Sequence, residues 1–157
     1  MTLVLTSLIA DGIRAEGTKH YPHECCGLLL GTLNGSQKRA EVLWPVENVW
    51  TDEIALTETD SDHSLRDRFY IPPKAYLLAD RAARARNLEL VGCYHSHPDD
   101  RAKLSERDRI GAAGAGGGPD FSFVVVSVRD SNPGEMTTAL LSTDGQHWLL
   151  EELVIEE

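Results

Sequence analysis

The segment Gly92–Pro98 constrains this chain more than any other, because it places two histidines one residue apart at the end of an apolar run. Residues 88–94 are expected to form a β-strand, and side chains two residues apart in a strand point to the same side. His95 and His97 can therefore approach one ion. Pro98 stops further strand pairing and turns the chain away.

A helix is expected after this strand, over residues 104–115, with Ser105 as its N-cap. Asp108 would lie on the first turn of that helix and face the strand end. Two imidazoles and one carboxylate are the ligands of a catalytic zinc site with a fourth position open for an acidified water. A histidine pair alone is more often structural, but the aspartate at this distance favours a metal centre.

The same residues resemble a known family signature. His95-Ser96-His97-Pro98, Ser105 and Asp108 match the pattern H-S/T-H-P-x6-S-x2-D of the JAMM (MPN+) metalloproteases. The block Pro22–Gly31 is similar to the P-x-E-x-C-G-L-L-x-G segment of the prokaryotic branch, and Glu24 matches the family's upstream glutamate. The chain is therefore identified as a compact, prokaryotic-type member over most of its length.

This resemblance implies an α/β fold of the MPN/JAB type (cytidine-deaminase-like), a sandwich with a curved mixed sheet flanked by about three helices. It also implies one Zn2+ per chain, held by His95, His97 and Asp108. Glu24 would be the general base that deprotonates the water and passes the proton to the leaving amine. Ser105 would donate a hydrogen bond to the oxyanion, a role that the resemblance alone ranks above capping the helix.

Two parts of the chain depart from the family pattern. Relatives commonly have a proline at the position of Leu104, so we expect the loop over residues 99–103 to be less rigid. Residues 48–70 are acidic and poorly periodic, and they are expected to form an inserted loop before residues 69–71. Such a loop either gates the metal site, contacts a substrate, or is a solvated excursion without a role.

Members of the family hydrolyse peptide or isopeptide bonds after the C-terminal Gly-Gly of ubiquitin or ubiquitin-like proteins. Between Asp108 and Phe121 there is little room for the second insertion with which eukaryotic members clamp the substrate tail. The resemblance therefore implies a small ubiquitin-like sulfur-carrier protein as substrate. Two other functions stay open: a zinc peptidase or amidohydrolase acting on small or cell-wall peptides, and a non-catalytic MPN scaffold subunit.

Charge and composition limit the partners. A net charge of −10 without a basic stripe argues against nucleic acid. No apolar run has the length of a membrane span, and the N-terminus lacks the features of a signal peptide. Cys25, Cys26 and Cys93 do not suit a disulfide framework and are expected to be buried. We expect one cytoplasmic domain over residues 1–157, with the oligomeric state open, a homodimer included.

The remaining elements follow from periodicity and turn residues. A first helix is expected over residues 6–19, and a second helix is expected from residue 72. Strands are expected over residues 24–32, 38–47, 121–128, 136–142 and 147–155, the first two joined by a turn at Asn34-Gly35. The second helix should bury an apolar stripe made of Ala75, Leu78, Ala79, Ala82 and Ala85. His20 and His23 are expected to lie outside the metal site, and the sequence indicates no partner for His63.

Overall fold

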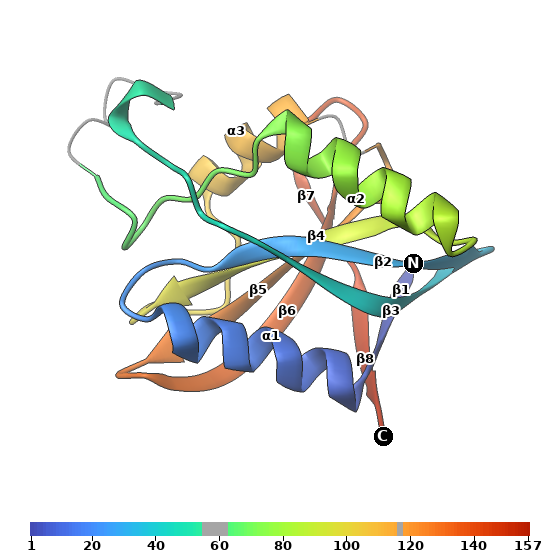
Figure 1. Cartoon of the computed structure of the whole chain (residues 1–157), viewed down its shortest axis with the longest axis horizontal. Helices are drawn as coiled ribbons and strands as arrows, with labels where there is room; N and C mark the ends of the chain where they lie inside the picture. The colour runs from blue at the N-terminus through green and yellow to red at the C-terminus, as the bar shows by residue number, and fades with distance from the viewer. Residues whose placement is uncertain (55–62, 116–117) are drawn as a thin grey trace.

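The computed structural model describes residues 1–54, 63–115 and 118–157. Its strands are β1 (Thr2–Thr6), β2 (Cys26–Asn34), β3 (Gln37–Val46), β4 (Glu89–Pro98), β5 (Ser122–Arg129), β6 (Asn132–Leu141), β7 (Trp148–Leu150) and β8 (Glu152–Glu156). Its helices are α1 (Ser7–His20), α2 (Pro73–Ala85), α3 (Glu106–Ala115) and the 3-10 turn η1 (Asp52–Ile54). In this part of the chain, the strands form one mixed sheet in the order β7-β6-β5-β4-β2-β3-β1-β8. Helix α1 covers one face, whereas α2 and α3 lie on the other, so the expected α/β fold is confirmed (Figure 1).

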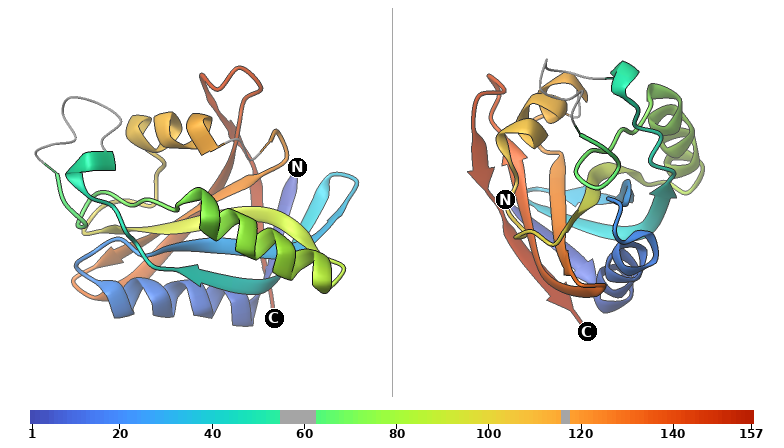
Figure 2. Two further views of the ribbon diagram at one scale, coloured as in Figure 1. Left: turned by 45° about the horizontal axis from the view of Figure 1, so that its top comes forward. Right: turned by 90° about the vertical axis from the view of Figure 1, so that its left-hand side faces the viewer.

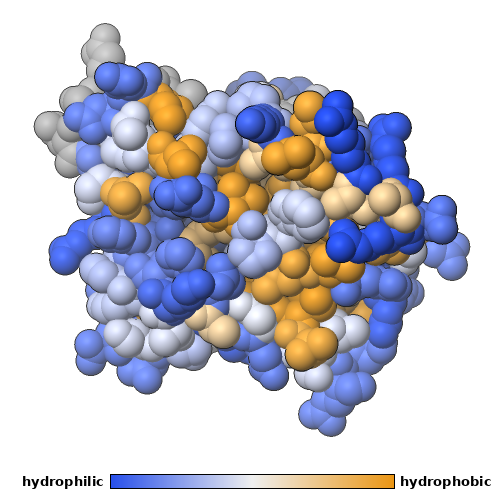
Figure 3. All heavy atoms as spheres, viewed as in Figure 1, coloured by the Kyte–Doolittle hydropathy of each residue, from blue (hydrophilic) through white to orange (hydrophobic). Residues whose placement is uncertain are grey.

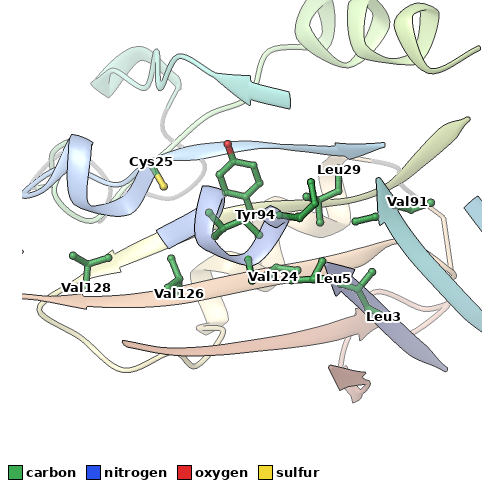
Figure 4. Packing of buried hydrophobic residues seen from close by; sticks show 13 residues of the cluster. Leu3, Leu5, Cys25, Leu29, Val91, Tyr94, Val124, Val126 and Val128 are labelled. Carbon is green, nitrogen blue, oxygen red and sulfur yellow. The ribbon is translucent and has the colours of Figure 1, made fainter. Parts of the chain in front are cut away.

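Helix α1 packs on the sheet through a core centred on Tyr94. The helix begins after Thr6, whose side chain accepts a hydrogen bond from the backbone N–H of Ile9 at 3.2 Å. The Tyr94 ring is fully buried among aliphatic side chains (Figure 4). A Cβ at Gly27 would lie 2.3 Å from the Tyr94 hydroxyl oxygen. Glycine on β2 therefore makes room for the tyrosine that fills this side of the sheet.

Helix α2 buries a narrower stripe than the sequence predicted. Ala79 and Ala83 are fully buried against the sheet, whereas Leu78 is 47% exposed and Ala85 is exposed as well. Neighbouring side chains on a helix point about 100° apart. Ala79 and Ala83, four residues apart, therefore define the face that packs on the sheet, and Leu78 points away from it. Apolar atoms reach the surface in the band between α1 and α2 (Figure 3). No helix in the described ranges is long and apolar enough to span a membrane.

The C-terminal segment 147–155, expected as one strand, forms two. Glu151 separates β7 from β8, and these strands lie at opposite edges of the sheet. With one residue between them, the two edges must come close at this point, and β8 also approaches β6. The sheet is accordingly strongly twisted and curved (Figure 2). Strand β8 pairs in parallel with β1, which the sequence reasoning did not predict.

The three cysteines are buried and free, as expected. Burial raises the pKa of the Cys25 thiol to about 12, and it raises the pKa values of Cys26 and Cys93 as well. Thiols with such pKa values stay protonated near neutral pH and are poor nucleophiles and metal ligands. They act as small core residues.

Candidate metal centre

Strands β2 and β4 bring the predicted site residues to one face of the sheet. Cys26 lies opposite His95 in their antiparallel register. Glu24 lies two residues before Cys26, just ahead of the first residue of β2, and the charge of Asp108 acts on its carboxyl. Because residues directly opposite each other share a face, His95 shares the face of Cys26, which packs in the layer of α2 and α3, and His97 lies on the same side two residues further along β4.

Helix α3 adds the third predicted ligand. The two Nε2 atoms of His95 and His97 lie 3.1 Å apart. Asp108 lies 3.3 Å from His95 Nε2 through Oδ1 and 3.2 Å from His97 Nε2 through Oδ2. The ligand atoms of these three residues all lie within 4.8 Å of one another. His20 and His23 are outside this group, as expected. His63, for which the sequence indicates no partner, lies with its Nδ1 2.5 Å from Asp67 Oδ2.

The protonation of this group suits a cation. His97 Nδ1 lies 2.9 Å from the carbonyl oxygen of Arg101, which can only accept, so Nδ1 carries a hydrogen and Nε2 faces the cluster. Burial lowers the pKa of His95. Burial alone would raise the pKa of Asp108, but the two imidazoles outweigh it and hold that pKa well below its usual value. Burial likewise opposes a charge on His97, yet Asp108 raises the pKa of His97 above its usual value. The buried carboxylate therefore favours a positive charge at this point, and nitrogen and oxygen donors of this kind fit zinc.

Ser105 holds Asp108 through two reciprocal hydrogen bonds. The Ser105 hydroxyl oxygen accepts from the backbone N–H of Asp108 at 3.0 Å, and Asp108 Oδ2 accepts from the backbone N–H of Ser105 at 2.8 Å. This is the arrangement of a helix capping box, so Ser105 caps α3. The cap uses a lone pair of the hydroxyl and leaves its hydrogen to donate. Capping and the expected oxyanion contact are therefore compatible.

The loop before α3 is held by side chains of three strands. Successive carbonyl oxygens of residues 100–102 accept hydrogen bonds from Ser127 Oγ at 2.5 Å, His97 Nδ1 at 2.9 Å and Thr137 Oγ1 at 2.7 Å. These residues belong to β5, β4 and β6. Hydrogen bonds from three strands thus position the loop that leads into α3.

Glu24 is buried beside the cluster, with 5% of its surface exposed. Burial raises the pKa of its carboxyl well above the usual value, and the negative charge of Asp108 raises it further. Its backbone N–H donates to the carbonyl oxygen of Leu65 at 2.7 Å. The main chain therefore holds in place a carboxyl whose pKa is raised, the direction of shift that carboxyl groups in acid-base catalysis commonly show.

The family profile described as prokaryotic homologs of the JAB domain matches residues 7–142. The chain belongs to this family. Its fold and its cluster of His95, His97 and Asp108 agree with that membership, and the resemblance inferred from the sequence is confirmed.

Solved structures are similar to this JAB domain over nearly its whole length. A protein from Desulfitobacterium hafniense is 24% identical with a TM-score of 0.75, covering 99% of this chain and 94% of that one. A protein from Salinibacter ruber is 33% identical with a TM-score of 0.67, covering 100% and 92%. A JAB1/MPN domain protein from Archaeoglobus fulgidus is 14% identical with a TM-score of 0.52, covering 98% and 99%. A search of curated proteins found no match.

Asn48 of this JAB domain ties the main chain of Glu24 to both ends of the 48–70 loop. Its side-chain nitrogen donates to the carbonyl oxygens of Glu24 at 3.1 Å and Arg68 at 2.9 Å. Its side-chain oxygen accepts from the backbone N–H groups of Trp50 and Tyr70, each at 3.2 Å. Sequence reasoning missed this residue, because a single asparagine in a polar loop carries no pattern.

The described end of the 48–70 loop also reaches the candidate ligand His95. The Phe69 ring stacks on the His95 ring with centroids 4.4 Å apart and an interplanar angle of 22°. Residues 55–62, where several of the acidic side chains lie, are outside the described residues. Gating by this loop therefore stays a prediction, whereas its contact with the site is observed.

Proposed function

We propose that this JAB domain is a zinc-dependent hydrolase. Its reaction would be cleavage of a peptide or isopeptide bond after the C-terminal Gly-Gly of a ubiquitin-like sulfur-carrier protein. The observation that carries the proposal is the convergence of three ligand atoms within 4.8 Å beside the buried carboxyl of Glu24. A structural histidine pair needs neither the aspartate nor a second carboxyl with a raised pKa.

Each side chain has a distinct task. His95, His97 and Asp108 would hold one zinc ion, which supplies Lewis acidity that lowers the pKa of a water molecule and polarises the scissile carbonyl. The Glu24 carboxylate accepts a proton from the attacking water and delivers it to the nitrogen of the leaving amine. The Ser105 hydroxyl donates to the carbonyl oxygen as it becomes negative, an effect of roughly 3 kcal/mol for one well-placed donor.

The sulfur-carrier substrate is supported by the family membership and by the short connection between α3 and β5. Only residues 116–121 separate Ala115 from Ser122, which leaves little chain for a clamp on a large folded partner. Cell-wall peptides and a scaffold role are the alternatives that the experiments must distinguish. A scaffold has no physical need of a general base beside a complete ligand set.

The ligand assignment is tested by metal analysis. We expect about one zinc per chain in the wild-type protein and none in His97→Ala, because two of three ligands hold zinc poorly. Full zinc content in His97→Ala would refute the ligand assignment. Glu24→Gln should keep its zinc.

The reaction is tested with sulfur-carrier proteins extended beyond Gly-Gly and with cell-wall stem peptides, followed by mass spectrometry. Wild type should release the extension after Gly-Gly, and Glu24→Gln should be slower by roughly 10²–10⁴-fold, as expected on loss of a general base. Cleavage of stem peptides alone would select the second enzyme class. A zinc-loaded protein that cleaves neither substrate would select the scaffold.

A further inference from the structure

A cavity of about 440 Å³ adjoins the metal cluster, between α2, α3, β4 and β7. This volume lies in the range of sites that enclose a small molecule or a large side chain. Most of its wall is aromatic or aliphatic, and the side chains that dominate it are Phe69, Ile71, Tyr76, Leu104, Ile110 and Trp148.

The cavity opens onto the atoms that would react. His95 and Asp108, two of the three metal ligands, form part of its wall. A side chain that fills the end of the cavity beside these two residues would belong to a substrate residue close to the cleaved bond. Asp108 is the only carboxylate among the lining residues, and it is engaged with His95 and His97. Arg107 also lines the cavity, and it already has an interaction within the protein. The wall thus offers mainly a hydrophobic surface and no acidic partner for a basic side chain.

Glycine has no side chain to fill such a space. In the proposed reaction both residues on the carbonyl side of the bond are glycine, so the cavity must receive the other side. We propose that the leaving group carries a bulky apolar side chain, an aromatic ring or leucine, and that this side chain occupies the cavity. This inference rests on the proposed function. It adds a preference for the residue after the cleaved bond, which cleavage after Gly-Gly alone does not specify.

The preference is tested with a panel of carrier proteins extended after Gly-Gly by one residue: Phe, Leu, Gly, Asp or Lys. Burial of a large apolar side chain should raise kcat/KM for Phe and Leu by roughly 10- to 100-fold over the other three. Release of the residue is followed by mass spectrometry with the zinc-loaded wild type. Equal kcat/KM values across the panel would overturn the inference.

A cavity-filling variant tests the location. Gly114 lines the cavity, and a Cβ placed there meets no other atom within 4 Å. Gly114→Leu should therefore be accommodated and should lower kcat/KM for the Phe extension toward the value for Gly. Ala113→Leu is the matched control, because Ala113 is exposed on the same helix and does not line this cavity. An undiminished Phe preference in Gly114→Leu would place the preference elsewhere and overturn the assignment.

A binding measurement separates this inference from the proposed reaction. Zinc-loaded Glu24→Gln protein is titrated by calorimetry with Gly-Gly-Phe-amide and with Gly-Gly-Gly-amide. Tighter binding of the Phe peptide by 10-fold or more, lost in Gly114→Leu, supports the cavity even if no carrier is cleaved. Absent cleavage alone refutes the reaction, whereas equal binding of the two peptides refutes the cavity's role.

Discussion

Two buried glutamates of this sheet, Glu24 and Glu151, meet opposite surroundings. Glu151 Oε2 lies 2.8 Å from the ammonium group of Lys38, and its Oε1 accepts the hydroxyl hydrogens of Ser122 and Thr138 at 2.7 Å each. The ion pair is buried, with 1% and 0% of the two side chains exposed. The protein itself therefore balances the charge of Glu151.

Around Glu24 the charge is not balanced in this way. Burial and the neighbouring carboxylate of Asp108 outweigh the nearby arginines and raise the pKa of Glu24. Asp108 in turn raises the pKa of His97, so it favours a positive charge within the ligand cluster. The Lys38–Glu151 pair balances its own charge, whereas a buried carboxylate beside two imidazoles, as in Asp108 with His95 and His97, suits a bound cation. In the described structure, the group of His95, His97 and Asp108, which could hold a metal ion, has this arrangement.

The largest effect on stability is expected at the buried ion pair of Lys38 and Glu151, called the closed pair below. Lys38→Met removes the cation and leaves Glu151 charged and buried, which should lower the free energy of unfolding by about 3–5 kcal/mol. Urea denaturation measures this change. The control is the double variant Lys38→Met/Glu151→Leu, which removes both charges and should regain most of the loss. The loss in the double variant could instead equal the sum of the losses in Lys38→Met and Glu151→Leu alone. Packing, and not charge balance, would then determine the free energy of unfolding.

Zinc should bind the open cluster, by which we mean His95, His97 and Asp108. It should leave the Lys38–Glu151 pair unaffected. At free zinc 100-fold above its Kd, the ion should raise the free energy of unfolding by about 2.7 kcal/mol. Lys38→Met should show the same increment, because the two sites share no residue and distant effects add. His97→Ala should show none in a thermal or urea titration. An increment that differs between wild type and Lys38→Met would mean that the two clusters are coupled.

A smaller effect is expected at Asn48, which holds the main chain of Glu24. Asn48→Asp keeps the shape and the acceptors but cannot donate to the carbonyls of Glu24 and Arg68. We expect a loss of roughly 1–3 kcal/mol in the free energy of unfolding, with kcat lowered more than KM. Asn87→Asp is the control, since Asn87 is exposed in a turn after α2. A change in KM alone would argue against a positioning role.

The open cluster could be predicted from the sequence, and the closed pair could not. The candidate ligands His95 and His97 lie on one strand, and Asp108 follows within one loop and one helical turn, so local spacing determines their meeting. Lys38 and Glu151 meet only because the sheet curls until β7 and β8 approach from opposite edges. That curvature depends on long-range pairing, for which the sequence shows no pattern.

The same distinction explains the errors in the elements. Residues 147–155 alternate well enough to read as one strand, and nothing local shows that Glu151 turns inward between two. Strand β1 is short, and its parallel partners β3 and β8 are far away in sequence. Helix α2 was placed correctly but its buried stripe was not, because the choice between neighbouring alanines depends on the surface that they meet.

The smallest expected change in the free energy of unfolding is that of Glu24→Gln. At neutral pH it should be an increase, whereas Lys38→Met should cause a decrease. The pKa of Glu24 is about 4.3 in the unfolded chain and is raised in the metal-free folded protein. The folded state therefore holds the proton more tightly, and stability from this group is complete below about pH 4.3 and is lost as pH rises through the folded pKa. Each unit of pKa difference corresponds to about 1.4 kcal/mol.

Glutamine imitates the protonated carboxyl and does not titrate. In chelator-treated protein, the free energies of unfolding of wild type and Glu24→Gln should agree near pH 4, and the variant should become the more stable one as pH rises. Glu151→Gln is the matched control, because it removes a charge that Lys38 needs and should be less stable than wild type at neutral pH. Two glutamates given the same substitution would then move stability in opposite directions. If both variants lose stability alike, Glu24 is a structural carboxylate and the cluster beside it is no open cation site.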